Sequence, residues 1–166
     1  LAKIVPVTLF LIFLLVYFVL HSLRDAVLVL IAVPFSLVGG ILALAVTGTN
    51  FSISASVGFI SLFGVAVQGA LILISRIQEL IHEGKDMDEA IMLSAEVRLR
   101  PVLMTSLAAA IGLLPAAVAT GIGSQSQQPL ARVVVGGMLT SAVLILVVLP
   151  ILYRLWHRRR NGESEA

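Results

Sequence analysis

Residues 57–75 read VGFISLFGVAVQGALILIS, and this apolar run without a charged side chain decides the fold class. A helix rises about 1.5 Å per residue, so a run of this length can cross a hydrocarbon core about 30 Å thick. Small residues allow neighbouring helices to approach closely, and an amide in hydrocarbon needs a hydrogen-bonding partner. We therefore expect this segment at the centre of a helical bundle, with Gln68 facing inward among Gly64, Ala66, Gly69 and Ala70.

The composition of the whole chain is that of an integral membrane protein. Of its 166 residues, 59% are hydrophobic and 12% are charged, and the mean hydropathy is +1.09. Soluble domains carry about 25% charged residues. There is no cysteine, which excludes a disulfide framework and a thiolate metal site. No charged residue occurs between Asp25 and Arg76, a stretch long enough for two membrane spans and a short turn.

The apolar runs predict an all-α fold, a polytopic membrane bundle that forms a single transmembrane domain over residues 1–166. Five spans are expected at residues 4–20, 26–46, 55–75, 101–119 and 130–153. A polar loop at 76–100 and a tail at 154–166 complete the chain. No acidic residue lies within the five predicted spans.

Basic residues predict the orientation of the bundle. Alternate connections and the tail hold nine of the eleven basic residues: Arg24, Arg76, Lys85, Arg98, Arg100, Arg154, Arg158, Arg159 and Arg160. The opposite side holds Lys3 and Arg132. Cytoplasmic loops are enriched in Lys and Arg, so we expect the loop at 76–100 and the C-terminus in the cytoplasm. The chain begins at Leu1 without methionine, and we interpret it as part of a larger protein.

The loop at 76–100 has the pattern of a second, surface-lying helix. Gly84 ends one helical extension, and Asp86 with Glu89 three residues later forms a capping-box pattern. We expect an interfacial helix that lies along the cytoplasmic surface before the chain turns into the membrane at Pro101. A simple solvated connector remains an alternative.

Three polar residues are candidates for a transport pathway: Gln68, Arg98 and Thr105. Arg98 and Thr105 are seven residues apart, which places them on one face if both are helical. Such a ladder can pass or sense a proton if carboxylates from outside this chain face it. Each residue also has a plainer interpretation: Gln68 as a contact between helices, Arg98 as a cytoplasmic anchor, and Thr105 as a hydroxyl bonded to its own backbone.

Glycines and prolines within the spans are expected to act in close packing or as hinges. The candidates are Gly39, Gly40, Gly64, Gly69, Pro115, Gly136 and Gly137. The three histidines, His21, His82 and His157, pair with no second ligand at suitable spacing, so we expect no metal site in this chain alone. Nucleotide-loop and nucleophile-elbow motifs are absent, and we expect no cofactor, no enzyme activity and no nucleic-acid partner.

Three motifs, in this order and spacing, resemble the resistance–nodulation–division efflux transporters. They are GFISLFGVAVQGALIL at 58–73, RLRPVLMTSLAAAIGLLP at 98–115 and TGIGSQSQQPLARVVVGGM at 120–138. The last motif is most similar to the heavy-metal branch of cobalt–zinc–cadmium type pumps. The resemblance covers residues 5–153.

The resemblance implies that the chain corresponds to the last five of twelve transmembrane helices, the eighth to the twelfth, of a proton-driven antiporter. The complete pump of this family is a homotrimer in the bacterial inner membrane, which joins a periplasmic adaptor and an outer-membrane channel. Gln68 would fall where the tenth helix often carries Lys or Glu, and Arg98 and Thr105 would fall on proton-relay positions of the eleventh. The relay aspartates would belong to the N-terminal half, which this chain lacks.

Departures from the family pattern bear on the substrate. Gln68 cannot titrate, Gly69 replaces a common Asn, and Val102 stands where the copper–silver type has Lys. These departures favour export of divalent metal cations. The alternatives are an exporter of organic or multidrug substrates from the same superfamily, and a truncated membrane fragment that transports nothing. A five-helix channel would need a continuous polar stripe, whereas the spans show scattered Ser, Thr and Gln.

Overall fold

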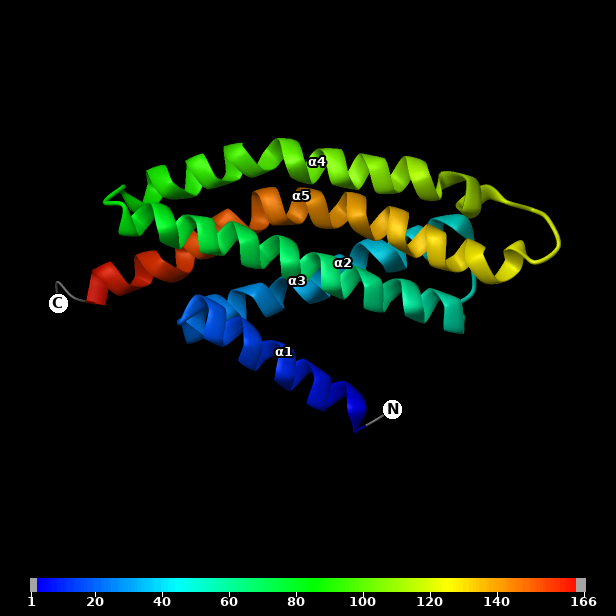
Figure 1. The fold of residues 1–166 in the computed structure, drawn as a ribbon, viewed down its shortest axis with the longest axis horizontal. Helices are drawn as coiled ribbons and strands as arrows, with labels where there is room; N and C mark the ends of the chain where they lie inside the picture. Colours follow the sequence, from blue (N-terminus) through cyan, green and yellow to red (C-terminus); the bar gives the residue numbers. More distant parts are fainter. Residues whose placement is uncertain (1–2, 164–166) are drawn as a thin grey trace.

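The computed structural model describes the backbone of residues 3–163 and the side chains of residues 3–4 and 6–158. Five helices follow one another: α1 Ile4–Leu20, α2 Leu23–Thr47, α3 Ile53–His82, α4 Met87–Val118 and α5 Ser124–Glu163. They run alternately in opposite directions, so the α1–α2 corner, the α3–α4 turn and the C-terminal end of α5 share one end of the bundle (Figure 1). The predicted all-α class is confirmed.

Four of these helices, α2 to α5, are long and apolar enough to cross a membrane. The first helix, α1, is apolar but has only 17 residues in the structure. At about 1.5 Å per residue it falls short of a hydrocarbon core about 30 Å thick. Of the five expected spans, four correspond to helices that are long enough to cross a membrane. The remaining one corresponds to α1, a shorter apolar helix beside them.

Two helices form the centre of the bundle: α3 contacts all four other helices, and α5 packs against α2, α3 and α4 (Figure 1). Residues 57–75, which form the middle of α3, therefore lie centrally, and they contribute buried side chains to both apolar clusters of the interior. Adjacent glycines on α5 explain its place. Gly136 lies against Ala43 of α2, and Gly137 lies against Leu62 of α3, so both neighbours approach its backbone closely.

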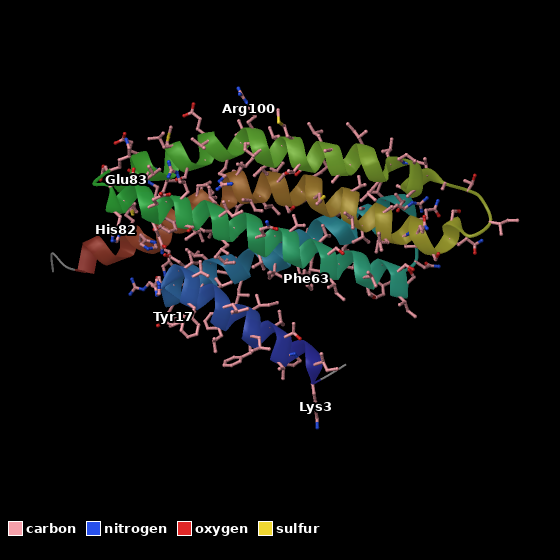
Figure 2. All side chains as sticks on the ribbon, in the orientation of Figure 1. Lys3, Tyr17, Phe63, His82, Glu83 and Arg100 are labelled. Atoms are coloured by element: carbon pink, nitrogen blue, oxygen red, sulfur yellow. The ribbon has the colours of Figure 1, made fainter. Side chains whose placement is uncertain are left out.

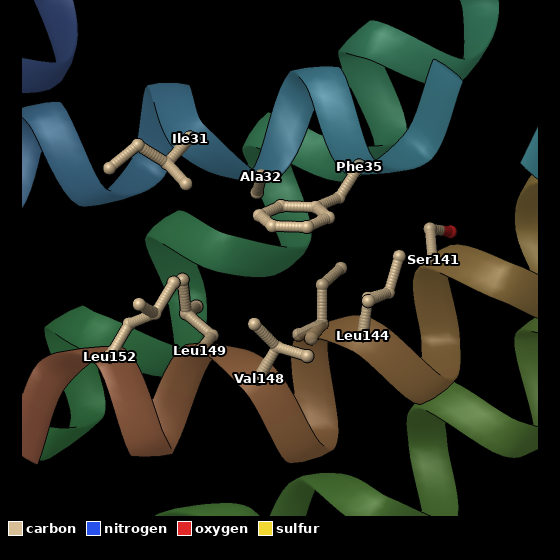
Figure 3. A pocket seen from close by; sticks show the side chains of 9 residues that line it. Ile31, Ala32, Phe35, Ser141, Leu144, Val148, Leu149 and Leu152 are labelled. Atoms are coloured by element: carbon tan, nitrogen blue, oxygen red, sulfur yellow. The ribbon is translucent and has the colours of Figure 1, made fainter. Parts of the chain in front are cut away.

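Two apolar clusters fill the interior. The larger one lies toward the shared end and combines residues from all five helices, among them Leu28, Ile77 and Ile145. The smaller one lies toward the opposite end and includes Phe59 and Val133. Between α2 and α5, where Phe35 points toward α5, a small gap of about 10 Å³ remains (Figure 3). A gap of this size is at the limit for a single water molecule.

The polar segment at 76–100 does not contain a separate interfacial helix. α3 continues to His82, and α4 runs as one helix from Met87 through Pro101 to Val118. Pro101 has no N–H to donate to the carbonyl of Val97, four residues earlier, so one backbone hydrogen bond is missing. Val97 is exposed, and the helix continues past this position without a turn. In the tail at 154–166, α5 stays helical to Glu163, and residues 164–166 lie outside the described part.

The helix ends follow the local sequence. Ser52 caps α3 by accepting a hydrogen bond from Ala55 N at 3.3 Å, and Asp86 caps α4 by accepting one from Met87 N at 3.1 Å. Gly84 has a positive φ of 89°, which suits the tight turn between these helices. Glu89 does not complete the predicted capping box, since its carboxylate pairs with Lys85 Nζ at 3.0 Å.

α2 starts earlier in the chain than predicted, and the additional turn includes an acidic residue. The helix begins at Leu23 rather than Ala26, because Ser22 is extended and acts as the N-cap residue. Asp25 therefore lies in the first helical turn, where the helix dipole favours a negative charge. Its side chain is buried, with 2% of the residue exposed. The predicted span at residues 26–46 holds no acidic residue, but the helix starts earlier and includes Asp25.

Candidate functional site

Gln68, Arg98 and Thr105 meet at one cleft between α3, α4 and α5. The cleft has a volume of about 320 Å³ and is lined mostly by apolar side chains, such as Val65 and Ile145. Gln68 comes from α3, while Arg98 and Thr105 come from α4. The sequence placed these residues in two segments more than twenty positions apart, and the antiparallel packing of α3 and α4 brings them together.

The continuity of α4 makes the spacing of Arg98 and Thr105 effective. Both residues are helical, and both line the cleft together with Pro101 and Val102. Arg98 is half-buried. Arg100, two positions later, points away from the bundle and is exposed (Figure 2). The helix thus distinguishes two arginines that look alike in the sequence.

Hydroxyl groups line the same cleft. Thr105 Oγ1 donates to the carbonyls of Pro101 at 2.9 Å and Val102 at 3.1 Å, so its proton is held by its own helix. Ser106 and Ser141 are buried and also line the cleft. Sequence reasoning missed Ser141 as a lining residue. Two adjacent hydroxyl residues, Thr140 and Ser141, in the charge-free part of the last span could have indicated a polar contact there.

Gln68 is more open to its surroundings than expected. The side chain is exposed at the cleft and does not point into a closed bundle centre. The neighbouring Gly69 explains how α3 approaches α5, since a Cβ at this position would lie 2.8 Å from Ile145 Cδ1. The amide is therefore accessible to a group that enters the cleft from outside this chain.

The chemistry of the cleft is cationic and hydrogen-bonding. Its lining contains one guanidinium, one amide and three hydroxyls, and no acidic residue among the described side chains lines it. Nor do any three His, Cys, Asp or Glu side chains of the described part gather as a possible metal site. A half-buried guanidinium in an apolar cleft favours an anionic partner, and a carboxylate can accept its hydrogen bonds in a bidentate manner.

The glycines singled out in the sequence lie mostly at contacts between helices. A Cβ at Gly40 would lie 2.5 Å from Phe59 Cε1, and one at Gly39 would overlap Thr140. Gly136 and Gly137 are equally crowded, whereas a Cβ at Gly64 would meet no heavy atom within 4 Å. Pro115 lies in the exposed last turn of α4. At these crowded positions a larger residue would force its neighbours to shift, most of all at Gly136, where the neighbours are a Cβ atom and a backbone carbonyl.

Known proteins resemble the chain along its whole length. The model of the AcrB/AcrD/AcrF family matches residues 1–157. The cobalt-zinc-cadmium resistance protein CzcA of Cupriavidus metallidurans is 50% identical over 98% of this chain, and the nickel and cobalt resistance protein CnrA of the same organism is 47% identical over 100%. The cation efflux system protein CusA of Escherichia coli K12 is 36% identical over 94%. The chain spans only 15–16% of the length of these relatives.

A solved structure shows the same arrangement of helices. The crystal structure of a heavy metal efflux pump matches 93% of this chain with a TM-score of 0.83 and 47% sequence identity, and the match covers 16% of that pump. The resemblance predicted from the three motifs is therefore confirmed, including its heavy-metal branch. The chain belongs to the AcrB/AcrD/AcrF family, as a membrane part similar to the heavy-metal pumps among the resistance–nodulation–division efflux transporters.

Proposed function

We propose that this chain is the C-terminal membrane part of a proton-driven pump that exports metal cations, with divalent ions as substrates. In the complete pump, Arg98, Thr105 and Gln68 respond to the protonation of carboxylates supplied by the N-terminal half. The names of CzcA and CnrA, which concern cobalt, zinc, cadmium and nickel, support the choice of divalent metals.

One observation carries this proposal: Arg98, Gln68 and Thr105 line one cleft that contains no carboxylate from the described residues. When an aspartate placed in the cleft is ionised, the guanidinium attracts it, and when the aspartate is protonated, this attraction is lost. The gain and loss of this contact can move α4 relative to its neighbours. The chain thus supplies the side that senses the charge, and the other half supplies the side that titrates.

Orientation and assembly follow from the same proposal. The helices lie in the bacterial inner membrane, and α2 to α5 are long enough to span it. The end that holds the α3–α4 turn and the end of α5 faces the cytoplasm, because it carries most of the basic residues. The complete pump forms a homotrimer and joins a periplasmic adaptor and an outer-membrane channel.

Substitution of Arg98 in the complete pump tests the proposal, with Arg100 as a matched control. Proton-coupled efflux of Zn²⁺ or Co²⁺ would be measured in proteoliposomes with an imposed pH gradient. We expect Arg98→Ala to abolish efflux, Arg98→Lys to retain part of it, and Arg100→Ala to leave it near the wild-type rate, because Arg100 points away from the bundle. Undiminished efflux by Arg98→Ala would refute the proposed role.

A further inference from the structure

A second polar cluster lies at the α1–α2 corner, outside the cleft described above. Gln78 Nε2 of α3 donates hydrogen bonds to Oδ2 of the buried Asp25 and, at 3.3 Å, to the carbonyl of Leu20. His157 of α5 places its Nε2 3.6 Å from Asp25 Oδ1. One carboxylate thus connects α2 with α3 and α5.

The orientation of the His157 ring is fixed by its other contacts. Its Nδ1 lies 3.1 Å from the carbonyl of Tyr153, one turn earlier on α5. The ring stacks on that of Tyr153, with centroids 4.1 Å apart and an interplanar angle of 18°. Since a carbonyl can only accept a hydrogen bond, Nδ1 must carry a hydrogen atom.

This arrangement determines what can face Asp25. With Nδ1 as donor, a neutral imidazole has a lone pair on Nε2, directed at an oxygen that is also an acceptor when the carboxylate is ionised. Two facing acceptors repel each other. Water from the bulk cannot donate a hydrogen bond to Oδ1 instead, because the Asp25 side chain is only 3% exposed. In the described structure Oδ1 has no hydrogen-bond partner. A proton between Nε2 and Oδ1, on either atom, removes the repulsion.

Further groups around Asp25 lie on α2, α4 and α5, and the Ser22 side chain is itself a hydrogen-bond donor to the carboxylate. Arg24 and Ser22, at the start of α2, are the further charged and polar groups that act on the carboxylate. Tyr153 of α5 stacks on the imidazole, and its phenol group also lies near enough to Asp25 to interact with the carboxylate electrostatically. On α4, the apolar Ala90 and Ile91 join the same cluster, while the carboxylate of Asp88 is held by Arg154 Nε of α5 at 3.0 Å.

The two partners differ in their access to water. The His157 side chain is 22% exposed and the Asp25 side chain 3% exposed. The imidazole can therefore exchange a proton with the surrounding solution and pass it to a carboxylate that the solution does not reach.

We propose that Asp25 and His157 form a proton-binding site, separate from the cleft of Arg98, whose proton holds the end of α5 against the α1–α2 corner. With the proton bound, Nε2 and Oδ1 attract each other and the contact is closed. When the proton leaves, a lone pair faces a carboxylate and the end of α5 is released. The contact therefore stabilises this end at low pH, and the stabilisation is lost as the pH rises.

Local opening of α5 can be followed by cysteine labelling in the complete protein with its other cysteines replaced. Leu152→Cys reports opening, because Leu152 packs against the buried cluster, and Leu155→Cys is the exposed reference, with 59% exposure. The ratio of their labelling rates cancels the pH dependence of the thiol itself. Between about pH 6 and pH 8.5 we expect this ratio to rise roughly tenfold, as expected for the loss of one charge-assisted contact. A ratio that does not change with pH would overturn the proposal.

Substitutions test whether the proton is bound between Asp25 and His157. In Asp25→Asn, the amide oxygen still accepts from Gln78 and the amide NH₂ donates to Nε2, so the contact stays closed and the ratio stays low at both pH values. His157→Phe keeps the stacking on Tyr153 but removes Nε2, so the ratio should be high at both. The control Glu79→Gln removes an exposed carboxylate at the same end, one that pairs with Arg76 on its own helix, and should keep the wild-type response. A persistent pH response in Asp25→Asn or in His157→Phe would assign the proton to another group, and the test requires no transport.

Discussion

Gly136 offers the sharpest test of how α5 packs against α2. A Cβ at this position would overlap Cβ of Ala43 and would lie 3.2 Å from the carbonyl oxygen of Gly39. Both neighbours belong to rigid parts of α2, a backbone carbonyl and a Cβ atom, so neither can turn aside. Gly136→Ala must therefore push the two helices apart or strain them.

The expected size follows from two opposing effects. Overpacking of a well-filled contact costs about 1–3 kcal/mol. Replacing Gly by Ala in a helix gains about 1 kcal/mol from intrinsic propensity. Because the neighbours of Gly136 are rigid, the steric effect lies toward the upper limit, and we expect the free energy of unfolding to fall by about 1–2 kcal/mol.

The chain provides its own control at Gly64, where a Cβ would meet no heavy atom within 4 Å. Gly64→Ala should leave the stability unchanged or raise it by up to about 1 kcal/mol. Reversible unfolding of the protein in mixed micelles, titrated with SDS and followed by far-UV circular dichroism, measures both variants. The double variant Gly136→Ala/Ala43→Gly should recover part of the loss, because it removes the methyl group in the way. Equal stability of Gly136→Ala and Gly64→Ala, or strictly additive effects in the double variant, would refute the reasoning.

The remaining predictions concern the end of the bundle opposite the C-terminus. Arg132 donates from Nε to the Ala117 carbonyl at 3.1 Å and from Nη1 to Thr49 Oγ1, so it joins α5 to the end of α4 and to the α2–α3 loop. Arg132→Lys cannot make both bonds and should lower the free energy of unfolding, measured by the same SDS titration, by about 1–2 kcal/mol. In a Thr49→Ala background the loss caused by Arg132→Lys should be smaller, because one of the two bonds is already absent. Ser52→Ala removes the cap of α3 and should cost about 1 kcal/mol, whereas Ser52→Asp should retain most of the stability; equal losses in both would contradict a capping role.

Much of this fold could be predicted from the sequence because the decisive signals are local. The apolar runs predicted all five helices, and α1 begins and ends where expected. The cap at Asp86 and the turn at Gly84 were also predicted correctly, since both depend on a few neighbouring residues. The spacing of Arg98 and Thr105 predicted a shared face, and the structure shows both at one cleft.

The errors arose where the outcome depends on packing between distant segments. Pro101 is a favoured residue in a first helical turn, and this preference led to the expectation of a break that the structure does not contain. The sequence pattern did not predict that α5 shares the centre with α3, because this depends on the close contacts of its paired glycines with α2 and α3. The predicted span began after Asp25, whereas the helix includes it, and Gln78 and His157, more than fifty positions away, make the burial of its side chain possible.

The two polar sites of this chain are separated within the fold. Gln68 and Gln78 are ten residues apart on α3, which is about 15 Å along the helix axis. Leu73, Ile74 and Ile77 lie between them and are buried, with at most 1% exposed. A proton at Asp25 and a carboxylate in the cleft of Arg98 therefore have no continuous polar path through the described residues of α3. Any influence of one site on the other must act through a shift of α3 or α5, the two helices that contribute residues to both.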